Sequence, residues 1–416
     1  MMAGPSNSVS ISIDKQLKKL RPLHPNCSIY LVPENLRKVK EDAYRPLLVS
    51  IGPVYYRDTT YAMMHEQKLR YFQQFCKRCN NENIDYYREV VRQKENQARN
   101  YYVETIELPA FDGFVNMLLL DVVFIIELFL IECVDGPHGR IDSSDRIFNK
   151  PRMIIEISRD IRLEENQVPF FLLRDLYQKL PATDNYPPLI DISYKFFMGM
   201  SSVVPERVRD DNIKHLVDLL RLSHLPSNLR KDNDHDFEFE FTSGVAKLME
   251  RGVKFVPSES ANLLDVRFVN GVLAIPKLKL TDDTESLFRN IMVFEQCHHY
   301  YNSYIIDYFA FLNSLINTPD DVEILTRKGI IENWLGNNEE VAELFSKLFK
   351  ETRLRNNKFY YSRICRQLNG YAKKPWHYYI TVLNTKYFNH PWSIIALVYA
   401  IVMLILTVLQ VYTGFK

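Results

Sequence analysis

The sequence predicts a mainly α (α+β) fold, in which a large helical domain carries a small antiparallel β section and one C-terminal transmembrane helix. Three observations support this prediction. Helical periodicity runs through most of the 416 residues, short β-type runs gather at about residues 237–280, and an uncharged apolar run ends the chain. The expected boundaries are a flexible N-terminus over 1–26, one domain over 27–390, the transmembrane helix over 391–412 and a short tail over 413–416.

Most helices are predicted from apolar residues that recur every three or four positions. In the first helix Met64, Leu69, Phe72 and Phe75 share the core side. The basic residues predicted to face outward from it are Lys68, Arg70, Lys77 and Arg78. The predicted helical segments are Tyr61–Asn80, Phe114–Cys133, Val168–Leu180, Asp211–Leu222, Ser286–Ile316, Asn338–Lys350 and a helix that begins near Val322 after an N-cap at Thr318-Pro319.

The apolar run Met117–Ile131 is predicted to be a central helix of the soluble core. It is shorter than the run at the end of the chain and contains Asp121 and Glu127. A carboxylate in the middle of a bilayer costs roughly 2.5–3.5 kcal/mol. Membrane insertion is therefore the weaker alternative, and we expect both acids to be hydrogen-bonded or to lie at the edge of the core.

The β section is predicted from four short runs. Residues 237–241 (FEFEF) alternate strictly, as a half-buried strand does, and the other runs cover 253–255, 264–268 and 272–275. Asn270-Gly271 is a two-residue hairpin signal between the last two runs. The neighbouring Val269 leaves the register of that hairpin open.

The run from Trp392 to Tyr412 is long and apolar enough to cross a membrane. About twenty helical residues span a hydrocarbon layer of about 30 Å. Pro391 suits the start of a helix, and the terminal aromatic rings suit the headgroup level. A buried core helix is the alternative. Side chains expected inside the membrane include Ser393, Ile394, Leu397, Ile401, Leu404, Leu406 and Val411.

The charges around this run predict its orientation. After Glu351 the sequence has no acidic residue, eight basic residues precede the run, and Lys416 follows it. Positive charge is retained on the cytosolic side, so we expect a cytosolic body, most simply at the plasma membrane. The basic stretch is also expected to contact anionic lipid headgroups, at about 1 kcal/mol per well-placed cation. Its members are Arg353, Arg355, Lys358, Arg363, Arg366, Lys373, Lys374 and Lys386.

Composition excludes several classes of protein. Lysine plus arginine (52) nearly balance aspartate plus glutamate (51), so no basic field for nucleic acid is expected. The six cysteines are scattered and indicate reduced thiols. Cys76 and Cys79 form a lone C-x-x-C without a second ligand pair, and no phosphate-loop or nucleophile-elbow motif occurs. We therefore expect no cofactor and no metal.

Several collinear motifs resemble one plant family. Residues 32–37, 44–46 and 50–53 resemble its opening V-P-x-x-L-R, Y-x-P and S-I-G-P signatures, and residues 163–171 resemble its L-L-E-N-Q-[IV]-P-F-F segment. Over about residues 27–412 the chain is thus similar to the family called domain of unknown function 247, although Val122-Val123 replace a usual glycine-cysteine pair. The motif residues are Pro33, Tyr44, Pro46, Gly52, Pro53, Asp121, Glu164, Asn166, Gln167, Pro169, Phe170, Phe171, Glu295, Pro391 and Trp392.

The resemblance implies a plant protein that is associated with a membrane through its C-terminus. Some grass members of that family look like determinants of self-incompatibility. This implies recognition of a partner rather than catalysis. The resemblance itself names no partner for this chain.

Two groups of residues have the types needed for catalysis or metal binding. Glu295 and His298 have the E-x-x-H spacing of half a di-metal site, but no second copy occurs, and packing is the alternative. Glu164 and Glu165 have the proximity that acid–base chemistry uses, but just before Pro169 and the next helix they suit structural capping better.

The sequence therefore predicts a membrane-anchored recognition, signalling or scaffold protein with a protein partner. The alternative is a hydrolase at the membrane surface that uses Glu164/Glu165 or Glu295/His298.

Overall fold

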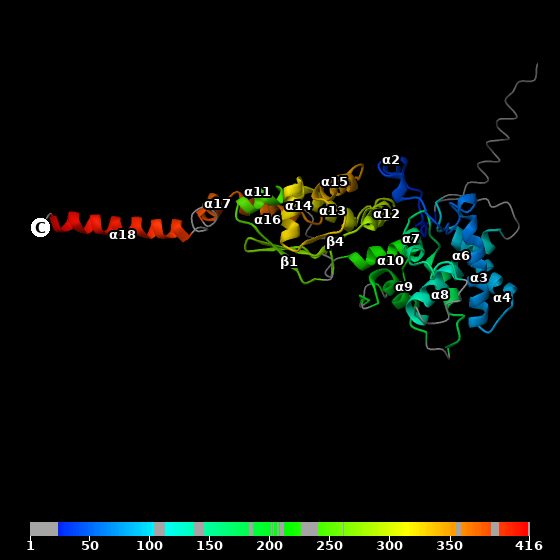
Figure 1. Ribbon diagram of the computed structural model, residues 1–416. Helices are drawn as coiled ribbons and strands as arrows, with labels where there is room; N and C mark the ends of the chain where they lie inside the picture. Colours follow the sequence, from blue (N-terminus) through cyan, green and yellow to red (C-terminus); the bar gives the residue numbers. More distant parts are fainter. Residues whose placement is uncertain are drawn as a thin grey trace, which may run out of the picture. The chain divides into compact units, whose positions relative to one another are not determined.

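A computed structural model describes residues 24–103, 113–136, 145–182, 186–200, 202, 204–205, 208, 212–225, 240–260, 262–354, 359–383 and 391–414. The contacts divide the chain into two compact units. Unit 1 comprises Met1–Ser223 and Ser286–Asn302, and unit 2 comprises His224–Glu285 and Ser303–Lys416. Figure 1 labels many of their helices and some of their strands. The predicted boundaries of a single domain remain a prediction.

Unit 1 is built around helix α6 (Gly113–Leu130), which contacts α3, α4, α8 and α9 (Figure 1). The window Gly113–Asp135 is 89% buried, which confirms the prediction of a core helix. The other helices are α2 (Glu34–Arg37), η1 (Glu41–Ala43), η2 (Thr59–Tyr61), α3 (Ala62–Arg78), α4 (Ile84–Arg92), α5 (Glu95–Arg99), the π-helix η3 (Ile131–Asp135), α7 (Pro151–Asp160), α8 (Phe170–Tyr177), α9 (Leu189–Met198) and α10 (Leu216–His224).

Helix α3 corrects part of the sequence prediction. Met64, Phe72 and Phe75 are buried as expected, but Leu69 is 46% exposed. Lys68 and Arg78, which were expected to face outward, are buried at 8% and 7% exposure. Each cation lies against a carboxylate of α6, so the polar stripe of α3 turns partly toward the core.

Unit 2 contains the β section. Its strands are β1 (Lys254–Ser258), β2 (Arg267–Val269), β3 (Val272–Pro276), β4 (Leu278–Leu280) and β5 (Ile331–Asn333). One sheet has the order β1-β3-β2 and the other pairs β4 with β5. Only β2 and β3 are antiparallel; β1 and β3, and β4 and β5, run parallel. The mainly α fold with a small β section is confirmed, but its pairing is mixed.

The Asn270-Gly271 hairpin is confirmed. Val269 pairs with Val272, and Asn270 and Gly271 have φ values of 50° and 81°. Two positive φ values are what a two-residue turn of the I′ type requires. Of the predicted strand at 237–241, residues 237–239 lie outside the described residues, and Glu240 and Phe241 are not in a strand.

The helices of unit 2 are α11 (Val245–Glu250), α13 (Tyr304–Leu315), α14 (Pro319–Arg327), α15 (Asn338–Phe349), α16 (Ser362–Ala372), α17 (Pro375–Val382) and α18 (Pro391–Gly414), and α12 (Asp282–His298) begins in unit 2 and ends in unit 1. The predicted N-cap is confirmed, because Thr318 and Asp321 form a capping box. The expected continuous helix Ser286–Ile316 is wrong. Residues 299–303 break it, where Asn302 and Ser303 favour a turn.

Candidate functional site

Residues 164–167 form a buried polar segment of unit 1 with many hydrogen bonds. They lie between α7 and α8, and all four side chains are at most 1% exposed. Buried polar groups are costly unless they are hydrogen-bonded, and most of the polar atoms of this segment have partners. Those partners show what the segment does.

Glu165 ties the first described residues to this segment. Its Oε1 accepts the Val32 N–H at 2.7 Å and pairs with Arg37, and its Oε2 accepts the Tyr55 hydroxyl at 2.5 Å. The carboxylate therefore holds two separate parts of the chain. This is a structural role for one member of the acid pair that the sequence singled out.

Asn166 and Gln167 continue the same network. The Asn166 Oδ1 accepts the Ile51 N–H at 2.6 Å, and its Nδ2 donates to the carbonyls of Val49 (3.0 Å) and Asp160 (2.9 Å). The Gln167 Oε1 accepts the Leu216 N–H at 3.0 Å, at the start of α10. Both amides supply hydrogen-bond partners to backbone groups that would otherwise be buried without one.

The position of Gly52 depends on two neighbours, Asp121 of α6 and Gln167 of the buried segment. Its N–H donates to Asp121 Oδ2 at 2.8 Å, and Lys68 pairs with the same carboxylate. Gly52 has φ +70°, and a Cβ there would lie 2.4 Å from the Gln167 carbonyl oxygen. Glycine is thus required both by the backbone conformation and by the close approach. As predicted for the core helix, Asp121 is hydrogen-bonded.

The remaining motif residues also have structural places. Pro33 and Pro169 precede the first residues of α2 and α8, and the Pro46 carbonyl accepts the Tyr61 hydroxyl at 2.9 Å. Tyr44, Pro53 and Phe170 are buried, and Phe171 is partly buried.

Glu164 connects the two candidate groups for catalysis or metal binding, which are the Glu164/Glu165 pair and the Glu295/His298 pair. Its Oε1 accepts the Tyr30 N–H at 3.2 Å, and the Tyr30 hydroxyl lies 3.0 Å from His298 Nδ1. Burial raises the pKa of Glu164 well above its usual range, because it disfavours the charged form of the carboxyl group. Tyr30 thus connects the acid pair of one segment with the E-x-x-H of α12.

Within the E-x-x-H, the two side chains have different partners. Glu295 is fully buried and accepts from Arg221 Nε at 2.9 Å. His298 stacks on Phe294 with ring centroids 5.2 Å apart, and burial lowers its pKa to about 4. No group of three or more histidine, cysteine or acidic side chains suited to a metal ion occurs among the described residues. The ion pair of Glu295 with Arg221 and the stack of His298 on Phe294 are contacts of the kind that the packing alternative expects.

A buried histidine that the sequence analysis passed over lies beside this cluster. His215 is fully buried, with Nε2 2.9 Å from the Ser28 carbonyl oxygen and Nδ1 3.4 Å from the Asp218 N–H. The neutral ring serves both contacts, as donor and as acceptor. Burial lowers its pKa to about 4. Its only sequence signal is a histidine one residue before an apolar helix.

His215 predicts acid sensitivity. Since its pKa is lower in the folded state than the ordinary histidine value of 6.5, the unfolded chain binds the proton first, and stability is lost as pH falls from about 6.5 to about 4. The pKa difference corresponds to about 3 kcal/mol. The measurement is urea unfolding of the full chain in mild detergent. The difference in free energy of unfolding between the native protein and His215→Gln should narrow by that amount as the pH falls over this interval. A gap that stays constant with pH would contradict the prediction.

The predicted membrane segment is helix α18. Of the window Ile395–Gly414, 0% is buried, and Leu397, Ile401, Leu404, Leu406 and Val411 are exposed. Trp392 is 80% exposed. Pro391, Ser393 and Ile394 belong to the helix. Among the basic residues that precede it, Arg355, Lys358 and Lys386 lie outside the described residues. By length and composition, α18 is able to cross a membrane.

Comparisons with known proteins place the chain in a family. The family DUF247, described as "Plant protein of unknown function", matches residues 29–406. The UPF0481 protein At3g47200 of Arabidopsis thaliana is 29% identical, over 92% of this chain and 85% of the relative. The putative UPF0481 protein At3g02645 of the same plant is 23% identical, over 98% of this chain and 93% of the relative. No solved structure matches the chain.

The match spans nearly all the motifs described above, including the buried segment 164–167 and most of α18. The predicted family is therefore confirmed: the chain belongs to the DUF247 family of plant proteins of unknown function.

Proposed function

We propose that this protein is held in a membrane by α18 and acts there by recognising a protein partner, as a signalling or scaffold component. Its body lies on the cytosolic side, most simply at the plasma membrane. The observation that carries the proposal is the contrast between two apolar helices. The α6 window is 89% buried, whereas none of the α18 window is.

The composition of α18 supports insertion. Between Ile395 and Gly414 there are eleven leucine, isoleucine and valine residues and no charged residue. Each such residue favours membrane insertion by about 0.3–0.6 kcal/mol, so together they favour it by about 5 kcal/mol. In water the same side chains would expose a continuous apolar surface.

The charge distribution supports a cytosolic body. The basic residues gather before α18, and Lys416 alone follows it. Retention of positive charge on the cytosolic side therefore favours translocation of the residues after the helix.

The buried polar network supports recognition over catalysis. Glu165 and Glu295 are each paired with an arginine, and Glu164 accepts from a backbone N–H. A general acid or base has to reach a substrate proton. Carboxyl groups that are at most 1% exposed and hold the chain together suit a stable platform better than a hydrolytic centre.

Two arginines in α18 are expected to abolish anchoring. Each arginine at the middle of a membrane helix costs about 2.5–3.5 kcal/mol of insertion free energy. In the double variant Ile401→Arg with Leu404→Arg, this cost exceeds the gain of about 5 kcal/mol from the apolar residues. The full chain expressed in plant cells should resist alkaline extraction from membranes, and the double variant should appear in the supernatant.

The matched control is Ile401→Ala with Leu404→Ala, which keeps the helix uncharged and should remain in the pellet. A glycosylation acceptor appended after Lys416 tests the orientation, because only a translocated tail is modified. If the wild-type chain is extracted by alkali, the anchor proposal fails.

Recognition is tested separately by proximity labelling. A labelling enzyme fused before Met1 of the wild-type chain should mark a reproducible set of proteins in plant membranes. The double arginine variant should lose that set. If the wild-type chain marks no protein reproducibly, the partner proposal fails even where the anchor stands.

A further inference from the structure

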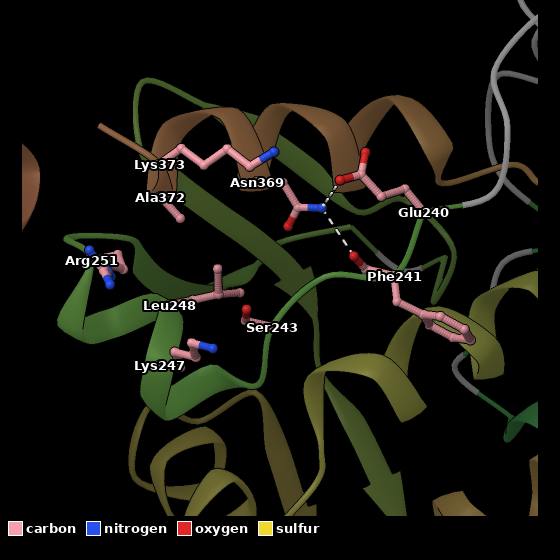
Figure 2. A pocket seen from close by; sticks show the side chains of 9 residues that line it. All are labelled: Glu240, Phe241, Ser243, Lys247, Leu248, Arg251, Asn369, Ala372 and Lys373. Atoms are coloured by element: carbon pink, nitrogen blue, oxygen red, sulfur yellow. Dashed lines mark hydrogen bonds between the residues drawn. The ribbon is translucent and has the colours of Figure 1, made fainter. Parts of the chain in front are cut away.

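Unit 2 contains a pocket of about 480 Å³ between α11 and the C-terminal end of α16 (Figure 2). Three basic side chains line it: Lys247 and Arg251 at α11, and Lys373 after α16. In Figure 2 the Lys373 side chain runs along α16 toward Asn369, across the pocket from Arg251 and Leu248. The volume of the pocket is within the usual range for small-ligand sites.

The described lining residues carry an excess of positive charge. Among the described residues that line the pocket, Glu240 is the one acid, and its Oε1 accepts from Asn369 Nδ2 at 2.8 Å. Asn369 also donates to the Phe241 carbonyl at 3.0 Å, which fixes this edge of the pocket (Figure 2). The basic side chains pair with no acid among the described residues, although Arg251 lies 5.1 Å from the ring centroid of Tyr378.

These groups suit a phosphate-bearing ligand. A guanidinium offers several N–H donors to phosphate oxygens, and ammonium groups add mobile positive charge. Ser243 adds a hydroxyl group, which is a hydrogen-bond donor, to the pocket wall. Leu248 and Ala372 supply an apolar part, so the pocket is able to hold a small organic group that carries the phosphate.

The neighbouring helix favours a lipid as the source of that phosphate. Helix α17 begins two residues after Lys373 and contacts both α11 and α16. It exposes Trp376 at 70% and Tyr379 at 59%. Such rings favour the headgroup level of a membrane.

The chain also limits how far this region lies from α18. The seven residues 384–390 separate the end of the described α17 region from Pro391. Fully extended, they reach about 25 Å. The α17 region is therefore tethered close to whatever surface α18 enters.

We propose that Lys247, Arg251 and Lys373 form a binding site for the phosphorylated headgroup of an anionic phospholipid. The site rests on the proposed anchoring by α18, which brings it to the membrane. It would give the protein a preference among membranes in addition to the anchor itself.

The test is a titration of the full chain in neutral detergent. Three probes are compared: short-chain phosphatidylinositol 4-phosphate, short-chain phosphatidylcholine, and soluble inositol 1,4-bisphosphate. The phosphorylated lipid should bind most tightly and phosphatidylcholine should not compete with it. At about fivefold per cation, Lys373→Gln should weaken binding about fivefold, and the triple variant Lys247→Gln, Arg251→Gln, Lys373→Gln about a hundredfold.

The matched control is Lys277→Gln, Lys350→Gln, Lys374→Gln, which removes the same charge from exposed lysines of unit 2 that do not line the pocket. Equal losses in the two triple variants would overturn the proposal. Inositol 1,4-bisphosphate that binds as tightly as the lipid would overturn the lipid source. Because the titration is done in detergent, it measures ligand binding at the pocket without the contribution of membrane anchoring. Alkaline extraction measures the insertion of α18 separately.

Discussion

Arg78→Met is expected to lower the free energy of unfolding of unit 1 by about 3–5 kcal/mol. Arg78 Nε lies 3.0 Å from Glu127 Oε1, and its Nη2 lies 2.5 Å from Asp135 Oδ2. The side chains of Arg78 and Glu127 are 3% and 0% exposed. The substitution leaves the Glu127 carboxylate in the core of α6 without its cation.

The loss should depend on pH. Burial already raises the pKa of Glu127 to about 7 against the lowering effect of Arg78, so removal of the arginine raises it further. An acid with a raised folded pKa favours the folded state below its unfolded pKa, and that contribution is lost as pH rises through the folded value. Arg78→Met should therefore be less damaging at pH 5 than at pH 8.

Urea unfolding of the full chain in mild detergent measures the loss, and hydrogen exchange of the α6 amides assigns it to unit 1. Lys77→Met removes a neighbouring exposed cation and should change stability by less than about 0.5 kcal/mol. Arg78→Met with Glu127→Leu replaces both charges by apolar groups and should recover most of the loss. The ion pair is not the cause if the double variant is as unstable as Arg78→Met at both pH values.

Arg78 also shows where sequence reasoning stops. The length of the apolar run and its two acids were sufficient to predict α6 as a core helix with satisfied carboxylates. On α3, the periodicity predicts that Lys68 and Arg78 face solvent. This prediction fails because their partners Asp121 and Glu127 lie 53 and 49 residues further along the chain. A local pattern contains no information about such partners.

The β section divides in the same way. The β2–β3 hairpin depends on two adjacent residues, Asn270 and Gly271, so its turn was predictable. The parallel pairing of β4 with β5 joins Leu278 to Ile331 across more than fifty residues. Nothing in either short strand specifies a parallel partner.

The candidate site was predicted only in part. Residues 164–167 were recognised as a motif, and a structural role was one of two readings. Their partners, such as Val32 and Ile51, are 133 and 115 residues away from Glu165 and Asn166, and are joined to them by backbone N–H groups that every residue type has. The missing information was therefore tertiary: the sequence does not contain the positions of these distant backbone partners.

Asp160→Ala is expected to destabilise unit 1 by about 4 kcal/mol. The Asp160 side chain is fully buried and accepts the N–H groups of Leu47 (2.8 Å), Leu48 (2.7 Å) and Val49 (2.9 Å). A buried donor that loses its acceptor costs about 1–3 kcal/mol. The bond of Val49 is buried and those of Leu47 and Leu48 are partly buried, so water able to enter the vacated space would recover part of the loss. The effect exceeds that of an ordinary hydrogen bond because one carboxylate serves three consecutive donors.

Two comparisons separate this explanation from a general loss of packing. Asp160→Asn keeps the volume and one acceptor oxygen but turns an NH₂ group toward the same donors, so it should lose at least half as much stability as Asp160→Ala. Asp85→Ala removes a carboxylate that is 82% exposed on α4 and should change stability by less than about 0.5 kcal/mol. Hydrogen exchange gives the local measurement: in Asp160→Ala the amides of Leu47, Leu48 and Val49 should lose protection before those of α6 do. If they stay protected, Asp160 is not the group that holds this segment, and the network around residues 164–167 carries it alone.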